Sequence, residues 1–125
     1  MKKIETTLAP AAIGPYSQAI ATGGLLFVSG QLPLDPATGS IVGTDAAQQI
    51  GQCLANIRAI AEAAGSSLEK VVKTTVLLTD LAEFPLVNEV YGSFFIDPYP
   101  ARACYQVSAI PKGARVEVEA VIALD

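Results

Sequence analysis

Three charged side chains in the C-terminal part of the sequence have the chemistry expected of a binding or catalytic site. Arg102 enters a segment rich in Ala, Cys, Tyr and Val, an apolar setting for a permanent charge. Its planar guanidinium suits two-point capture of a carboxylate. Glu117 and Glu119 alternate with apolar residues, and a half-buried carboxylate near Arg102 would hold or deprotonate a water molecule. The plainer interpretations stay open: an internal ion pair for Arg102 and a solvated strand face for the two glutamates.

Four other residues have types and positions that fit either a functional or a purely structural role. Cys104 is more typical of a small buried apolar residue than of a nucleophile, since there is no histidine to activate it. Tyr16 follows Gly-Pro at a rigid turn, where a packed ring with a satisfied hydroxyl is the ordinary arrangement. Ser29 and Gly30 end a predicted strand, and the glycine permits close approach of a ligand or of another chain segment.

Composition excludes several kinds of site. The sequence holds no histidine and only two cysteines, which argues against His-ligated metals, Ser-His and Cys-His nucleophiles, and a disulfide framework. It also lacks a Gly-rich phosphate loop and a CxxC motif. The net charge of −4 is opposite to what a phosphate-neutralising surface needs, so we expect no nucleic-acid partner.

The chain predicts a single domain, 1–125, located in the cytoplasm. No apolar run reaches the roughly 20 residues of a membrane helix, and the N-terminal residues are not followed by the apolar core of a signal peptide, so we expect no membrane partner. Hydrophobic residues make up 51% and charged residues only 16%, which favours an apolar surface covered by another subunit.

Periodicity predicts the elements that must position these residues. Helical spacing with capping residues indicates a helix over 45–64 and a second one from Asp80, restarted at Pro85 and stopped at Asp97-Pro98. Strands are predicted over 25–29, 70–79, 102–107 and 115–123. This order predicts an α+β fold with one mixed sheet and both helices packed on one face. Copies of the same chain would cover the other face.

Five segments of the sequence together resemble one family. They are AIGPYSQA (12–19), VSGQ (28–31), VKTTV (72–76), PARAC (100–104) and VEVEA (116–120). In order and spacing they are similar to the RidA family, also called YjgF or L-PSP, whose members are enamine/imine deaminases. The resemblance covers essentially the whole chain. It implies a chorismate-mutase-like (YjgF-like) α+β fold and a homotrimer with ligand clefts between neighbouring subunits.

The same resemblance implies a reaction and its residues. Members hydrolyse reactive 2-imino acids released by pyridoxal-phosphate dehydratases to 2-oxo acids and ammonia, without a cofactor or metal. By residue matching, Arg102 would clamp the substrate carboxylate with the backbone N–H of Cys104, and Glu117 would position water and carry protons. Glu119 would make a structural or intersubunit contact. The remaining implied substrate-binding residues line the cleft: Tyr16, Ser29, Gly30 and Asn88.

Other functions stay open beside 2-iminobutanoate/2-iminopropanoate deamination. One is a non-catalytic regulatory trimer that binds small carboxylates, against which the presence of Arg102 argues. Another is an endoribonuclease or translation inhibitor, a name that some family members carry; the acidic charge and absent histidine disfavour it. A third is a holdase for unfolded protein, which exposed apolar surface would permit.

Overall fold

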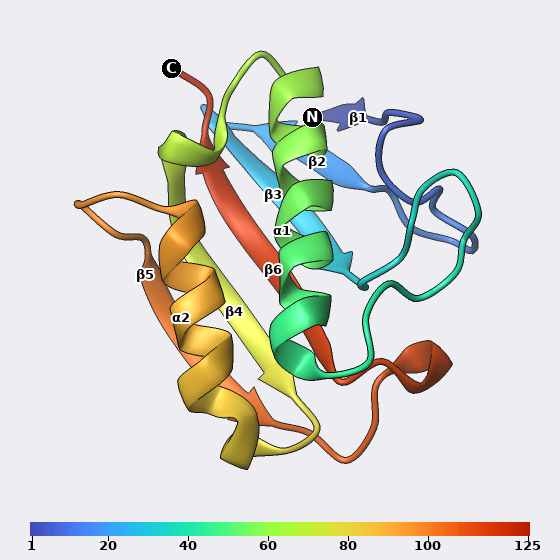
Figure 1. Ribbon diagram of the computed structural model, residues 1–125. Helices are drawn as coiled ribbons and strands as arrows, with labels where there is room; N and C mark the ends of the chain where they lie inside the picture. Colours follow the sequence, from blue (N-terminus) through green and yellow to red (C-terminus); the bar gives the residue numbers. More distant parts are fainter.

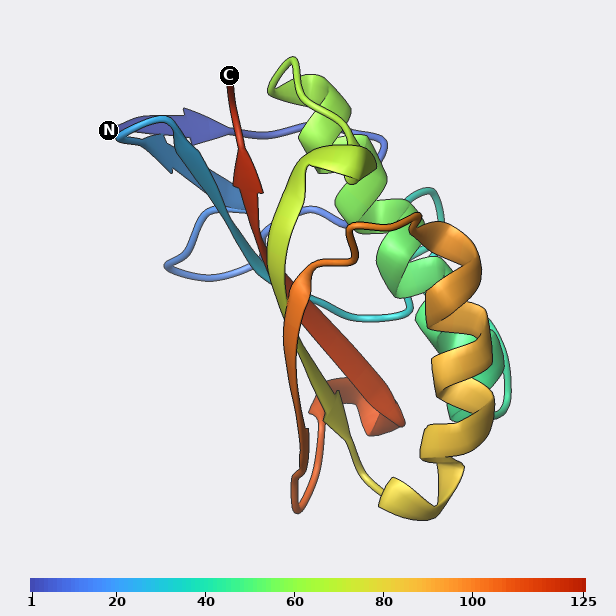
Figure 2. The same ribbon diagram turned by 90° about the vertical axis from the view of Figure 1, so that its left-hand side faces the viewer.

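One six-stranded sheet carries both helices on a single face, in the order β1-β2-β3-β6-β4-β5 (Figures 1 and 2). The computed structural model describes all residues, 1–125. The strands are β1 (Lys2–Ile4), β2 (Ala19–Thr22), β3 (Leu25–Gln31), β4 (Val71–Leu78), β5 (Ala101–Gln106) and β6 (Val116–Ala123). The helices are α1 (Ala46–Ala63) and α2 (Phe84–Phe94), with short 3₁₀ turns at η1 (Leu68–Lys70), η2 (Leu81–Glu83) and η3 (Pro111–Gly113). Only β4 and β5 are parallel; every other strand pair is antiparallel.

The α+β prediction, with one mixed sheet and two helices on one face, is confirmed. Two strands were not predicted, β1 and β2, which are only three and four residues long. A signal for the β2–β3 hairpin was present, because Gly23 and Gly24 take φ values of 59° and 78°, as the central residues of a tight hairpin turn do. β3 also runs two residues further than the predicted strand, to Gln31.

Helix α1 begins and ends at the residues that its sequence indicates. The Asp45 carboxylate accepts a hydrogen bond from the Gln48 backbone N–H at 2.8 Å. The Gln48 side chain accepts in turn from the backbone N–H of Thr44 at 2.9 Å. In a standard capping box it would accept from the N–H of Asp45, the next residue along the chain. Gly65, with φ 79°, takes the left-handed conformation just beyond the helix.

The core lies between the helices and the sheet. Its largest fully buried side chains include Leu54 and Ile57 of α1, which pack over Val116, Val118 and Ile122 of β6. These β6 residues alternate with the glutamates, so the period-two pattern correctly separates the helix-facing side of the strand from its other side.

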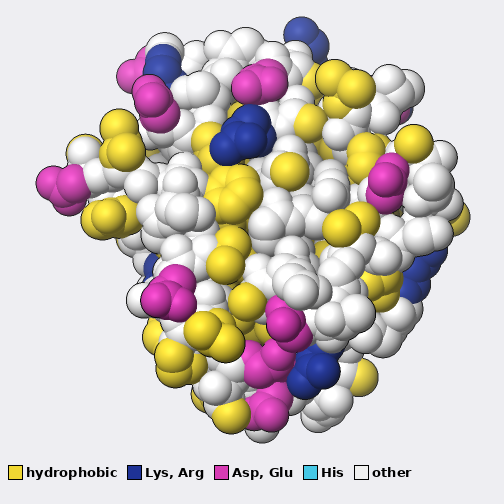
Figure 3. All heavy atoms as spheres, viewed as in Figure 1, with side chains coloured by type: hydrophobic (Ala, Val, Ile, Leu, Met, Phe, Trp, Pro, Cys, Tyr) yellow, Lys and Arg dark blue, Asp and Glu magenta, His cyan; other side chains and the backbone are white.

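The opposite face of the sheet carries no helix (Figure 2). Large apolar side chains remain accessible there: Phe27 of β3 is 45% exposed and Tyr105 of β5 is 57% exposed. On the helix-covered side, hydrophobic side chains form scattered groups among polar atoms (Figure 3). Neither helix is long and apolar enough to cross a membrane.

Candidate active site

A cleft of about 1090 Å³ opens beside the C-terminal end of β3 and the N-terminal part of β6. The loops 10–16 and 31–39 lie next to it. Five of the residues singled out from the sequence line it together: Tyr16, Ser29, Gly30, Glu117 and Glu119. Tyr16 is 54% exposed, so its ring is not packed into the interior as the plainer interpretation required. The fold therefore brings residues from three separate segments, Glu117 among them, into one cleft.

The two glutamates of β6 differ in their surroundings. Glu117 is half-buried, whereas Glu119 is exposed. Partial burial raises the pKa of the Glu117 carboxyl, and the negative charge of Glu119 raises it further. A carboxyl group whose pKa is moved toward neutrality can both accept and return a proton, so Glu117 is the better placed of the two for acid–base work.

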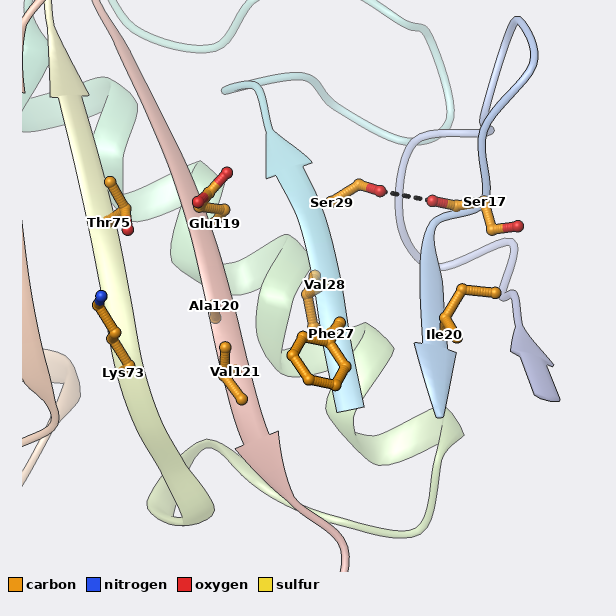
Figure 4. Close-up of a pocket in the computed structure, with 10 residues that line it drawn as sticks. All are labelled: Ser17, Ile20, Phe27, Val28, Ser29, Lys73, Thr75, Glu119, Ala120 and Val121. Carbon is orange, nitrogen blue, oxygen red and sulfur yellow. Dashed lines mark hydrogen bonds between the residues drawn. The ribbon is translucent and has the colours of Figure 1, made fainter. Parts of the chain in front are cut away.

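A second hollow of about 410 Å³ adjoins the cleft on the uncovered sheet face (Figure 4). Ser29 and Glu119 line both spaces. The Ser29 hydroxyl donates to the Ser17 carbonyl oxygen at 2.5 Å, which leaves the hydroxyl oxygen free to accept. Lys73 and Phe27 reach the same hollow from β4 and β3, so it combines the opposite charges of Lys73 and Glu119 with apolar surface.

Arg102 lies on the other face of the sheet. In the ladder it pairs with Thr74, which is buried on the helix side. Glu117 pairs with Leu77, three positions along β4, and residues paired directly across strands point to the same face. An odd separation on β4 reverses the face. One chain therefore does not bring Arg102 and Glu117 together, contrary to the simplest reading of two neighbouring charges.

Helix α2 holds Arg102 in place. The guanidinium donates to Asn88 Oδ1 at 2.7 Å, and its central carbon lies 4.8 Å from the Tyr91 ring centre and 5.2 Å from that of Phe84. The Tyr91 hydroxyl is within 2.7 Å of buried Thr74, which fixes the ring. The side chain of Arg102 is exposed and its hydrogen-bond partner is a neutral amide, so the internal ion pair considered from the sequence does not form.

The aromatic support for Arg102 was missed from the sequence, although a signal existed. Phe84, Asn88 and Tyr91 follow one another at intervals of four and three residues, which places them on one face of a helix. Helical spacing by itself indicates only that Tyr91 belongs to the apolar face of that helix. Its second role depends on β5 lying alongside α2, which helical spacing does not reveal.

Cys104 offers its backbone and not its thiol. Strand β5 is an edge strand, and Val107 just beyond it donates its N–H to Leu78 of β4 at 2.8 Å. Alternation along the strand then directs the N–H of Cys104 away from β4, toward the open edge beside Arg102. Burial raises the pKa of the Cys104 thiol, which disfavours the nucleophilic thiolate.

No cluster of three or more His, Cys, Asp or Glu side chains is arranged to hold a metal ion. Two groups of residues, on opposite faces of the sheet, are the candidate half-sites. One consists of Arg102, Asn88 and the Cys104 N–H at the β5 edge, and the other of the cleft around Glu117.

A family model described as Endoribonuclease L-PSP matches residues 6–124 of the chain. The chain belongs to the endoribonuclease L-PSP family. A RutC family protein of Sinorhizobium fredii is 63% identical, over 99% of this chain and 98% of the relative. A protein of Bos taurus named 2-iminobutanoate/2-iminopropanoate deaminase is 52% identical, over 96% of this chain and 88% of the relative.

Solved structures agree with this L-PSP family membership. RidA from an Antarctic Psychrobacter superposes with a TM-score of 0.94 at 48% identity, covering 98% of this chain and 99% of that one. Escherichia coli TdcF with bound serine gives a TM-score of 0.93 at 43% identity, with full coverage of both chains. The family resemblance and the YjgF-like fold are thus confirmed. Relatives carry deaminase names, while the family description refers to a ribonuclease.

Proposed function

We propose that this L-PSP family protein is an imine deaminase that hydrolyses 2-iminobutanoate and 2-iminopropanoate to 2-oxo acids and ammonia without a cofactor. The observation that carries the proposal is the pair of half-sites: an arginine held by an amide and two rings at a free strand edge, and a half-buried carboxyl group in a cleft. The names of mammalian relatives at about 50% identity support this reaction.

The proposed roles follow from the charge and geometry of each half-site. The Arg102 guanidinium binds the substrate carboxylate through two parallel hydrogen bonds, and the outward N–H of Cys104 supplies a third donor. An Arg102 without an acidic partner has its charge available for the ligand. A 2-imino acid carries one fixed negative charge, so a single arginine suffices to orient it.

Glu117 performs the proton transfers in this mechanism. Its ionised carboxylate removes a proton from water as the oxygen attacks C2 of the protonated imine, which gives a carbinolamine. The carboxylic acid then protonates the nitrogen, the C–N bond breaks, and loss of the hydroxyl proton forms the 2-oxo acid. One imine and one water become one 2-oxo acid and one ammonia. The raised pKa of Glu117 supports both directions of this transfer.

We also propose a homotrimer in which each site takes its Arg102 from one subunit and its Glu117 from the next. Residues on opposite faces of one sheet meet around one small ligand when a neighbouring copy contributes one of them. The uncovered sheet face, with Phe27 and Tyr105 accessible, offers apolar surface for that contact. Sedimentation equilibrium at micromolar concentration tests the assembly, and a monomer there contradicts it.

Ammonia release from enzymatically generated 2-iminobutanoate tests the reaction. We expect Arg102→Ala to lower kcat/KM by about 10³-fold and Arg102→Lys to fail largely, because an ammonium lacks the planar fork. Glu117→Gln should lose turnover but still bind 2-oxobutanoate, and Glu119→Gln is the matched control that keeps turnover. Near-normal turnover in Arg102→Ala would remove that residue from the mechanism.

The same assay separates this proposal from its alternatives. A regulatory trimer would bind 2-oxobutanoate through Arg102 without releasing ammonia. An endoribonuclease would cleave RNA with a dependence on basic residues, whereas this chain carries eight basic and twelve acidic residues.

A further inference from the structure

The end of β3 contains an irregularity beside the glutamates of β6. Val28 pairs with Ala120 and Gln31 pairs with Val118, so three steps along β3 match two steps along β6. This is a β-bulge with one extra residue, at Ser29-Gly30. Val28 and Gln31 are both buried and both pair with helix-facing residues of β6. The two residues between them are thereby presented toward the opposite side, where Glu117 lies.

Gly30 touches the Glu117 side chain so closely that any larger residue would collide with it. A Cβ atom placed on Gly30 would overlap Glu117 Oε2 and would lie 2.9 Å from its Cδ and 3.2 Å from its Cγ. The backbone of Gly30 is outside the left-handed region, so alanine fits the local conformation. The three atoms nearest to that Cβ all belong to the Glu117 side chain, which can rotate away. Alanine therefore conflicts with the carboxylate and not with the fold.

We propose that Gly30 is a positioning residue for the deaminase reaction: the space left by its missing side chain seats the Glu117 carboxylate in the cleft. This inference rests on the proposed function for its kinetic consequence. The seat holds the carboxylate against the β3 backbone, where it is partly shielded from water and directed toward the ligand space that Tyr16 and Ser29 also line. A side chain at position 30 would turn the carboxylate out of this seat.

The charged groups around the seat are few. On β6 the neighbour is Glu119, and from the surrounding loops Asp35 and Lys112 line the same cleft. Lys73 of β4 reaches only the adjoining hollow. Gly30→Ala changes none of these charges, so a change in the ionisation of Glu117 in this variant reports the position of the carboxylate and not a new charge.

Gly30→Ala and the control Gly51→Ala test the seat. Gly51 lies in α1 with open space where a Cβ would go. We expect Gly30→Ala to lower kcat on the order of 10²-fold, the loss typical of a misplaced catalytic group, with 2-oxobutanoate affinity within about twofold of wild type. The pKa of Glu117, read from its carboxyl ¹³C shift, should fall toward the ordinary glutamate value because the displaced group is better hydrated. Gly51→Ala should change neither.

Thermal unfolding with a second background separates the seat from a backbone requirement. If the conflict is with the carboxylate, the change in Tm that Gly30→Ala causes in the wild-type chain differs from the change that it causes in a Glu117→Ala background. An equal change in Tm in both backgrounds would overturn the proposal, as would wild-type kcat in Gly30→Ala or an unshifted Glu117 pKa. A wild-type protein that releases no ammonia would contradict the proposed function alone, because the pKa and Tm measurements judge the seat without turnover.

Discussion

Co-folding the Arg102→Ala and Glu117→Gln variants tests whether each site is built from two chains. Each variant alone lacks one of the two groups in every site. In a mixed assembly, an Arg102 retained by a Glu117→Gln chain meets a Glu117 retained by an Arg102→Ala chain. The test is motivated by the ladder, which puts the two residues on opposite faces of the same sheet.

The expected recovery follows from counting intact sites. With equal amounts of the two variants and random assembly, each site receives an unmutated arginine with probability one half and an unmutated glutamate with probability one half. About one quarter of the sites are then intact, so ammonia release should recover to about 25% of the wild-type rate per chain. The assay denatures and refolds the mixture, confirms its oligomeric state by sedimentation, and measures ammonia from 2-iminobutanoate.

The control pairs two variants altered in the same half-site. Arg102→Ala mixed with Asn88→Ala leaves no chain with the complete Arg102 half-site, because Asn88 accepts the guanidinium hydrogen bond. This mixture should recover no more activity than Asn88→Ala contributes by itself. If the Arg102→Ala and Glu117→Gln mixture stays inactive while forming mixed assemblies, the two groups act from one chain and the proposed intersubunit site is refuted.

Three further results are expected. The pKa of Glu117 is higher in the folded than in the unfolded state, so the carboxyl group stabilises the fold below its unfolded pKa, and this stabilisation is lost as pH rises through the folded pKa. Glu117→Gln should therefore have a higher Tm than wild type at pH 7. Below about pH 4 the two proteins should have the same Tm. Glu119→Gln removes a charge that raises the Glu117 pKa, so the acid limb of the pH–rate profile should move to lower pH. Tyr91→Leu removes a ring that flanks the Arg102 guanidinium and should raise KM by roughly tenfold, a cost of about 1.4 kcal/mol. Tyr91→Phe keeps the ring and should keep most of the affinity. Equal KM values in the two variants would contradict the positioning role of Tyr91.

Elements with strong local signals could be predicted from the sequence. The helix over 45–64 appears as α1, with Asp45 and Gly65 at its ends, because caps and helical spacing act within a few residues. The strand over 70–79 appears as β4. The short strands β1 and β2 escaped prediction, since three or four residues carry too little periodicity and are stabilised by pairing with β3.

The family, the α+β class and the residue types of the site all follow from the amino-acid sequence. Alternation along β6 also placed Glu117 and Glu119 on the face opposite the core, because that pattern is contained within one strand. The position of Arg102 relative to Glu117, by contrast, depends on how the strands are assembled into the sheet. β5 and β6 are separated in the sheet by β4, and the register of both pairings with β4 decides which faces their side chains share. Since a shift of one residue in either pairing would reverse that relation, only the assembled sheet reveals two half-sites on opposite faces.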